Sequence, residues 1–132
     1  MRQTVAWLVL AALGPIGMVQ ASSDVEAGRR VFARCSNCHE VGPNARNLFG
    51  PQLNGVLGRK AGSAPGYVYS PAMRASTVVW NAQNLSAFVR DTETVVPGNK
   101  MRFFGFLSKG QLADLVAYLR ANPALAPPQP RK

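Results

Sequence analysis

The chain has 132 residues, enough for one modest domain with its hydrophobic core and too few for a second. Its 15 Lys and Arg against 6 Asp and Glu give a formal net charge of +9, which excludes an acidic protein and points to nucleic acid, anionic lipid or acidic protein surfaces as partners. The basic residues are spread singly or in pairs, so most are expected to form a solvated basic surface.

Residues 1–21 have the pattern of a secretory signal peptide: a positive end at Arg2, a short apolar run and small residues near Ala21. The alternative is a retained membrane anchor, but a span needs about 20 apolar residues, and this run is shorter and interrupted by Gly14-Pro15. We therefore expect cleavage near Ala21 and export to the periplasm, without stable membrane insertion. Loss of Arg2 from the +9 chain leaves +8, and export makes nucleic acid the least expected partner.

The first predicted helix runs from about Asp24 to the cysteines. Ser23 and Glu26 fit a capping box, in which each side chain satisfies a free backbone N–H at the start of the helix. Gly28 within this helix costs stability relative to alanine, and it therefore predicts a close crossing with the last helix.

Residues 22–122 are expected to form one all-α domain with three main helices. Its stretch 41–70 is rich in Gly and Pro and predicts loops and turns rather than sheet, and such long loops need a surface to pack on. One helical turn is expected at 71–75 and a short helix at 82–90. Residues 123–132 are Pro-rich and predict an extended, flexible tail.

The last predicted helix begins at Ser108, which forms a second capping box with Gln111, and it ends before Pro123. Its apolar face should supply the close neighbour of the glycine in the first helix, at Leu115 or Tyr118.

Cys35, Cys38 and His39 spell C-x-x-C-H, the pattern of covalent c-type haem attachment. Two cysteines about one turn apart can hold the edge of the macrocycle, and the adjacent histidine can face the iron as its proximal ligand. A buried haem would also supply the surface that the loops need.

Three alternatives use the same residues. A thioredoxin-type dithiol enzyme expects a strand–helix setting, and the sequence has no evident strand. Structural zinc needs four protein ligands, and the chain has no further Cys or His. A plain disulfide leaves the histidine without a role.

The second axial ligand cannot be another histidine, because the chain has one. Met1 and Met18 leave with the signal peptide, so the position falls to Met73, to Met101 or to no protein ligand. The turn at Pro97-Gly98 can present a side chain inward, which favours Met101, and thioether ligation would raise the reduction potential.

Beyond the haem motif, four segments stand out: GPQLNGVLGRKAGSAPGYVYS, VVW, VPGNKM and ADLVAYL. Together with C-x-x-C-H they resemble the class I cytochromes c, which include mitochondrial cytochrome c and bacterial electron carriers. The resemblance covers residues 25–121. It implies the cytochrome c fold, in which helices, short turns and Gly- and Pro-rich loops wrap around one covalently bound haem c.

The resemblance implies roles for eight residues. Cys35 and Cys38 would hold the haem, and His39 and Met101 would ligate its iron. The Pro51 carbonyl would accept the His39 ring N–H. The buried haem propionate would be bonded by Arg59, Tyr69 and Trp80.

At three positions the chain departs from the mitochondrial pattern, which has Asn, Tyr and Thr where this sequence has Met73, Phe88 and Asn99. In that pattern the three residues hydrogen-bond an internal water and the Met sulfur. The polar network behind the haem is therefore expected to be altered, and Met73 stays a rival ligand.

A six-coordinate His/Met haem has no open position, so the implied function is soluble one-electron transfer between respiratory or photosynthetic complexes, not enzymatic catalysis. A haem peroxidase or gas sensor with an open sixth site is the alternative. The chain is expected to be a monomer that meets acidic surfaces of a cytochrome bc complex, terminal oxidase, photosynthetic reaction centre or periplasmic dehydrogenase. Basic residues expected near the exposed haem edge are Arg34, Arg46, Lys100 and Arg102.

Overall fold

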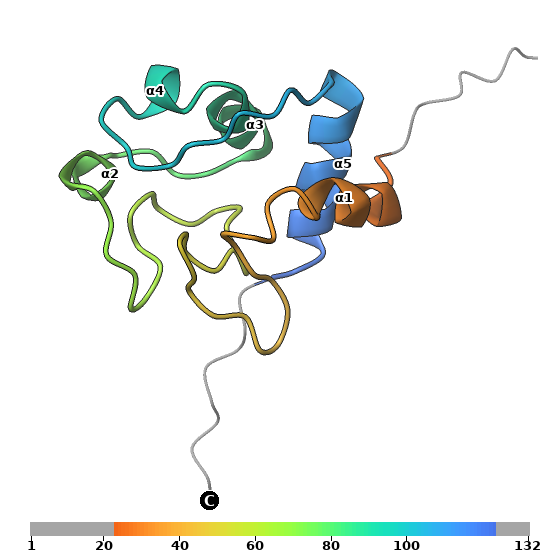
Figure 1. Cartoon of the computed structure of the whole chain (residues 1–132), viewed down its shortest axis with the longest axis horizontal. Helices are drawn as coiled ribbons and strands as arrows, with labels where there is room; N and C mark the ends of the chain where they lie inside the picture. Colours follow the sequence, from red (N-terminus) through yellow and green to blue (C-terminus); the bar gives the residue numbers. More distant parts are fainter. Residues whose placement is uncertain (1–22, 124–132) are drawn as a thin grey trace, which may run out of the picture.

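The computed structural model describes residues 23–123, which contain five helices (Figure 1). They are α1 (Val25–Phe32), α2 (Pro71–Ala75), α3 (Ala82–Arg90), α4 (Thr92–Val95) and α5 (Lys109–Arg120). Within residues 23–123 there is no strand, and the β-type pairing is an isolated bridge between Lys60 and Val79. The predicted all-α class is confirmed. The predicted signal peptide and nearly all of the predicted tail lie outside the described residues.

Helix α1 is capped by Asp24, so the prediction of Ser23 as its cap was wrong. The Asp24 carboxylate accepts the Glu26 backbone N–H at 2.8 Å, while the Glu26 side chain pairs with an arginine of its own helix instead of reaching back. The α-helix also ends at Phe32, before the cysteines. The Cys35 N–H donates to the Phe32 carbonyl at 2.7 Å, so the chain reaches the cysteines through turns tighter than an α-helix.

Helices α1 and α5 cross at Gly28 (Figure 1). A Cβ placed on Gly28 would overlap the Asp114 carbonyl and would lie 2.7 Å from Tyr118 Cβ. Tyr118 is one of the two predicted neighbours, and its ring packs on Phe32 with centroids 5.3 Å apart. The Asp24 backbone N–H also donates to the Asp114 carboxylate, at 2.9 Å. The two helices therefore meet through direct backbone contact.

Reciprocal capping boxes begin α3 and α5. The Gln111 N–H donates to Ser108 Oγ at 3.2 Å and the Ser108 N–H donates to the Gln111 side chain at 2.9 Å, as predicted. Asn81 and Asn84 exchange equivalent bonds of 2.8 Å at the start of α3. The sequence did not predict α4, because the four residues TETV carry no apolar stripe at helical spacing.

The Gly- and Pro-rich stretch 41–70 forms loops, as predicted, and lies across the molecule from α3 and α4 (Figure 1). Backbone hydrogen bonds hold these loops to the rest of the domain. The Gly55 N–H donates to the Asn122 carbonyl at 2.9 Å, and the Gly58 N–H donates to the Trp80 carbonyl at 2.7 Å.

One apolar core joins the helices and loops. Its buried members include Val31, Phe32, Val56, Met73, Trp80, Leu85, Phe88, Val96, Leu115 and Leu119. In the part of the chain that the structure describes, no helix has both the length and the apolar character to cross a membrane.

We expect Gly28→Ala to lower the free energy of unfolding by about 1–3 kcal/mol, because the added Cβ must push the α5 backbone away at Asp114. Thermal and denaturant unfolding followed by circular dichroism would measure the change. Gly110→Ala is the matched control, since its Cβ meets nothing nearer than 3.8 Å and should be neutral or slightly stabilising. Equal stability of the two variants would contradict the close crossing.

Candidate functional site

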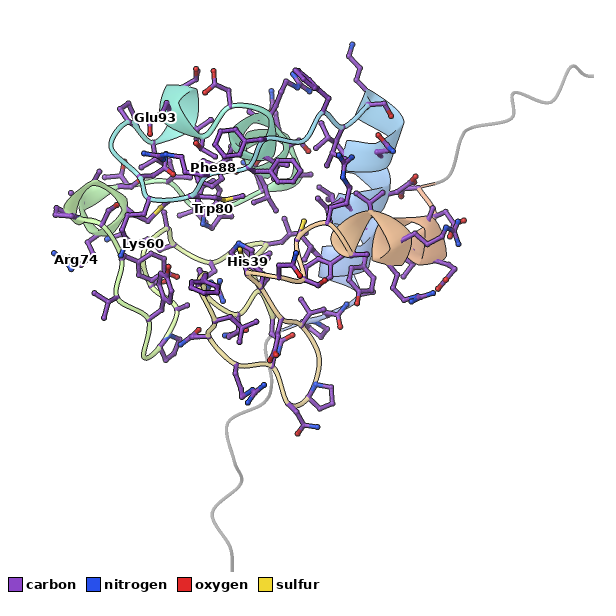
Figure 2. All side chains as sticks on the ribbon, in the orientation of Figure 1. His39, Lys60, Arg74, Trp80, Phe88 and Glu93 are labelled. Carbon is purple, nitrogen blue, oxygen red and sulfur yellow. The ribbon has the colours of Figure 1, made fainter. Side chains whose placement is uncertain are left out.

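A cavity of about 540 Å³ lies between the loops and the helices. Its walls are mostly apolar, and no Asp or Glu among residues 23–123 lines it. Figure 2 shows His39, Trp80 and Phe88 gathered toward the middle of the molecule. All eight residues singled out in the sequence line this one cavity: Cys35, Cys38, His39, Pro51, Arg59, Tyr69, Trp80 and Met101.

His39 is nearly buried, with 9% of its surface exposed. Its Nδ1–H donates to the Pro51 carbonyl at 2.8 Å, because a carbonyl can only accept. This bond leaves the lone pair of Nε2 free. Burial lowers the pKa of His39, the Pro51 bond opposes that shift, and the charge of Arg59 adds to it. The imidazole is therefore neutral at neutral pH, the form that binds a metal ion.

Gly50 allows the His39 ring to occupy this place. A Cβ on Gly50 would overlap His39 Cε1 and would lie 2.7 Å from Nδ1. The Gly50 N–H donates to the Cys38 carbonyl at 2.8 Å, which holds the loop backbone against the imidazole. A side chain at position 50 has no room, so glycine is required by close approach rather than by a special backbone angle.

Cys35 and Cys38 lie one turn apart at the cavity. The backbone N–H groups of Cys38 and His39 both donate to the Cys35 carbonyl, at 3.0 and 2.9 Å. Cys35 is half-buried, and burial raises the pKa of its thiol to about 11, whereas Cys38 is exposed. The two thiols are free, and one turn presents both to a single ligand edge.

A polar group occupies another part of the wall. The Arg59 guanidinium donates to the carbonyls of Asn54 and Gln52, at 3.1 and 3.0 Å, and among residues 23–123 it has no carboxylate partner. Burial lowers the pKa of Arg59 and raises the pKa of Tyr69. Trp80 is buried beside them. A half-buried cation without an acidic neighbour favours a ligand that carries a negative group.

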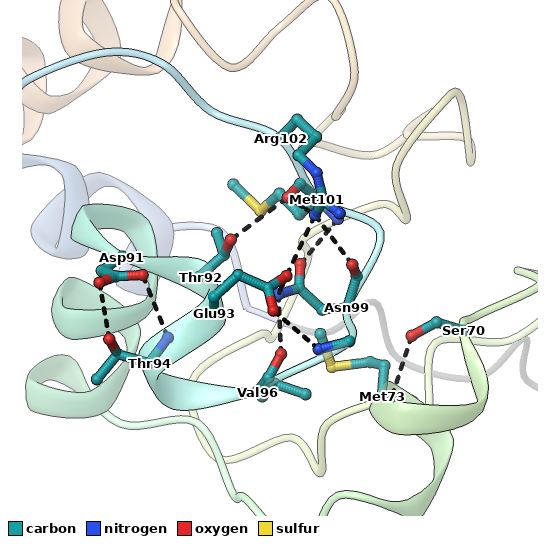
Figure 3. A network of polar contacts seen from close by, with 11 residues as sticks. Ser70, Met73, Asp91, Thr92, Glu93, Thr94, Val96, Asn99, Met101 and Arg102 are labelled. Atoms are coloured by element: carbon teal, nitrogen blue, oxygen red, sulfur yellow. Dashed lines mark hydrogen bonds and ion pairs between the residues drawn. The ribbon is translucent and has the colours of Figure 1, made fainter.

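Both candidate methionines line the cavity, Met73 from α2 and Met101 from the loop after α4 (Figure 3). Phe88 lines it too. Met73 and Phe88, two of the three departures from the mitochondrial pattern, therefore place apolar side chains in this wall. Asn99 does not line the cavity. Its side-chain amide donates to the Val96 carbonyl at 2.9 Å. The Asn99 side chain therefore points toward α4.

These walls fit the haem that the sequence predicts. Thiols, a neutral imidazole and a thioether are the side chains that hold c-type haem and its iron. The apolar lining suits the faces of the macrocycle, and Arg59 with its polar neighbours suits a propionate.

Three of the four basic residues expected at the haem edge line the cavity and are exposed, so they lie at its mouth: Arg34, Lys100 and Arg102. Arg46, the fourth, does not line this cavity. Its guanidinium lies 3.4 Å from the Glu40 carboxylate and lines a separate hollow on the surface.

Sequence reasoning missed the aromatic residues at the surface. Phe103 lines the cavity, whereas residues Phe104 and Phe106 are 90% and 97% exposed. The signal was available, because an extended segment places Phe104 and Phe106 on the face opposite to Phe103, so the two faces cannot both point into the cavity.

The comparisons with known proteins agree with this geometry. The family model described as cytochrome c matches residues 25–123. The chain is 43% identical over 96 residues to cytochrome c-550 of Nitrobacter winogradskyi, covering 73% of this chain and 88% of that protein. It is 41% identical over 112 residues to cytochrome c2 of Rhodomicrobium vannielii, covering 85% and 90%.

Solved structures are similar as well. Cytochrome c2 from Rhodospirillum centenum superposes with a TM-score of 0.72 at 33% identity, covering 76% of this chain and 99% of that one. Cytochrome cH from Methylobacterium extorquens superposes with a TM-score of 0.68 at 38% identity, covering 74% and 98%.

We expect Gly50→Ala to lower the free energy of unfolding by about 1–3 kcal/mol and to displace the His39 ring, because the new methyl group overlaps it. Thermal unfolding would report the loss of stability, and the NMR shifts of the imidazole would report the displacement. Gly110→Ala should leave both unchanged. Unaltered imidazole shifts in Gly50→Ala would show that the loop can move aside.

Proposed function

This chain belongs to the cytochrome c family, and on that premise we propose that it is a soluble periplasmic carrier of single electrons and not an enzyme. Its cofactor is one c-type haem, bound covalently. The observation that carries the proposal is the convergence of two thiols, one imidazole and one loop thioether on a single apolar cavity. The predicted signal peptide supports export.

The residues at the cavity have separate tasks in this proposal. Cys35 and Cys38 would attach the haem through thioether bonds, and His39 and Met101 would supply the nitrogen and sulfur ligands of its iron. When bound, the haem supplies an iron that gains and loses one electron. Pro51 fixes the imidazole by accepting its Nδ1–H, so the ring cannot rotate when the charge at the metal changes.

The same contacts favour electron transfer over bond-making chemistry. The Met101 thioether would be available as an iron ligand, whereas a peroxidase or gas sensor would need a site without that ligand. The buried side chains of Leu85, Phe88 and Leu119 exclude water from the cavity, which limits rearrangement of solvent as charge moves.

We further propose that redox partners dock at the cavity mouth. Arg34, Lys100 and Arg102 give this mouth a positive potential that would attract acidic surfaces and orient the encounter. The acidic partners in view are a cytochrome bc complex, a terminal oxidase, a photosynthetic reaction centre or a periplasmic dehydrogenase.

Met101→Ala should abolish the weak long-wavelength charge-transfer band that thioether ligation gives ferric haem, and should lower the reduction potential. Met73→Leu removes the other sulfur from the cavity with little change in volume and should leave the band intact. Absorption spectra of the two ferric variants decide between the methionines. The reverse pattern would assign the ligand to Met73, and rapid binding of carbon monoxide by the unsubstituted ferrous protein would favour the open-site alternative.

The rate at which the anionic oxidant hexacyanoferrate(III) oxidises the ferrous protein should fall as salt is added, because ions screen its attraction to the mouth. The double change Lys100→Gln with Arg34→Gln should slow the low-salt rate about threefold or more. Stopped-flow mixing would measure it. The control Lys60→Gln with Arg120→Gln removes equal charge from exposed sites that do not line the cavity. Equal slowing by both pairs would show that only net charge matters.

A further inference from the structure

Glu93 of α4 contacts three residues of the loop that carries Met101 (Figure 3). One carboxylate oxygen, Oε2, accepts the Gly98 backbone N–H at 3.0 Å. The other, Oε1, accepts from the Asn99 side-chain amide at 3.3 Å and from the Arg102 guanidinium at 3.4 Å. A single side chain thus holds both ends of the turn that presents the methionine.

Asn99 links the Glu93 carboxylate to the backbone of Met101. The Asn99 side chain is almost fully buried, with 2% of the residue exposed. Its Oδ1 accepts the Met101 backbone N–H at 2.8 Å, while its amide is bound by Glu93 and by the Val96 carbonyl. Because an amide bound on both sides cannot rotate, the Met101 backbone is held at a fixed place relative to α4.

Helix α4 offers a firm base for these contacts although it is a single turn. The Asp91 carboxylate accepts the Thr94 backbone N–H at 3.2 Å and the Thr94 hydroxyl at 2.7 Å. These two bonds lower the pKa of Asp91, so the cap stays ionised at neutral pH. Thr92 of the same turn donates to the Met101 carbonyl at 3.4 Å.

The loop needs such support from outside. Its turn passes through Gly98, whose φ of +81° only glycine adopts readily, and the side chains of Lys100 and Arg102 are exposed. Its backbone closes a single short-range bond, from the Asn99 N–H to the Val96 carbonyl at 3.2 Å. From outside the turn, the Val68 carbonyl accepts one bond, from Lys100 Nζ at 2.8 Å, and Thr92 donates one, to the Met101 carbonyl, whereas the Glu93 carboxylate accepts three.

We propose that Glu93 is a positioning residue that keeps the Met101 thioether at the iron, acting through Gly98, Asn99 and Arg102 rather than by touching the haem. The inference rests on the proposed ligation by Met101. Loss of the carboxylate would shift the loop toward conformations in which the sulfur is away from the metal, and the axial position would then accept an external ligand more readily.

The test is a titration of the haem-loaded ferric protein with imidazole, a neutral ligand that must displace the thioether, followed in the absorption spectrum. Glu93→Ala should bind imidazole about tenfold more tightly, because the loop loses its hydrogen bonds from Gly98, Asn99 and Arg102 to the carboxylate. Glu93→Gln keeps one acceptor oxygen and should fall between Glu93→Ala and the unsubstituted protein.

Glu26→Ala is the matched control. Glu26 is as exposed as Glu93, at 56% against 53% of the side chain, and pairs with Arg29 of α1 instead of the loop. Its removal should leave imidazole affinity unchanged. Leu112→Ala adds a control for general loss of stability, because Leu112 is 3% exposed and does not line the cavity.

An imidazole affinity of Glu93→Ala within about twofold of the unsubstituted protein would overturn the inference. So would an equal rise in Leu112→Ala, since the effect would then be one of stability alone. If the unsubstituted ferric protein lacks the thioether charge-transfer band, Met101 is not the ligand and the proposed ligation fails together with this inference. A normal band with unchanged affinity in Glu93→Ala defeats the inference alone.

Discussion

The direct backbone contact between α1 at Gly28 and α5 at Asp114 determines where the remaining parts of the domain can lie. Helix α1 leads within a few residues to Cys35, so the crossing fixes where the attachment turn starts. Helix α5 supplies Leu115 and Leu119 to the cavity wall, so the same crossing sets one side of the cavity. A bulky residue in place of Gly28 would alter the core and the ligand site together, because both depend on one distance between helices.

Local sequence signals predicted the parts of the fold that depend on neighbouring residues. The capping box of Ser108 and Gln111 is one such case, because both bonds form within a single turn. The cap of α1 was placed one residue early, since Ser23 and Asp24 are both good cap residues and the Asp24 N–H gains a bond from Asp114, 90 residues away. That bond exists only in the folded domain, so no local pattern could have revealed it.

The haem motif and the family resemblance identified the residues of the site. They did not reveal the direction in which each side chain points. Spacing placed Asn99 among the three departures from the mitochondrial pattern, yet only the structure shows that it faces α4 and not the cavity. The sequence did not predict α4, because a four-residue turn held by Asp91 and Thr94 has no periodic apolar pattern. The contacts of Glu93 with the loop were therefore not predicted either. The sequence could not show that Arg34 lines the cavity and Arg46 does not. The Arg46 side chain pairs with Glu40, and this contact is seen only in the folded domain.

Phe104 and Phe106 are exposed on a protein with a strongly basic cavity mouth, so two opposing forces act between its copies in concentrated solution. Mutual repulsion between copies, each carrying an excess of positive charge, keeps these rings apart when little salt is present. Added electrolyte weakens that repulsion but not the tendency of phenyl groups to leave water. Colloidal stability of this domain is therefore a balance between Coulombic and apolar forces, and it shifts toward self-association as ionic strength rises.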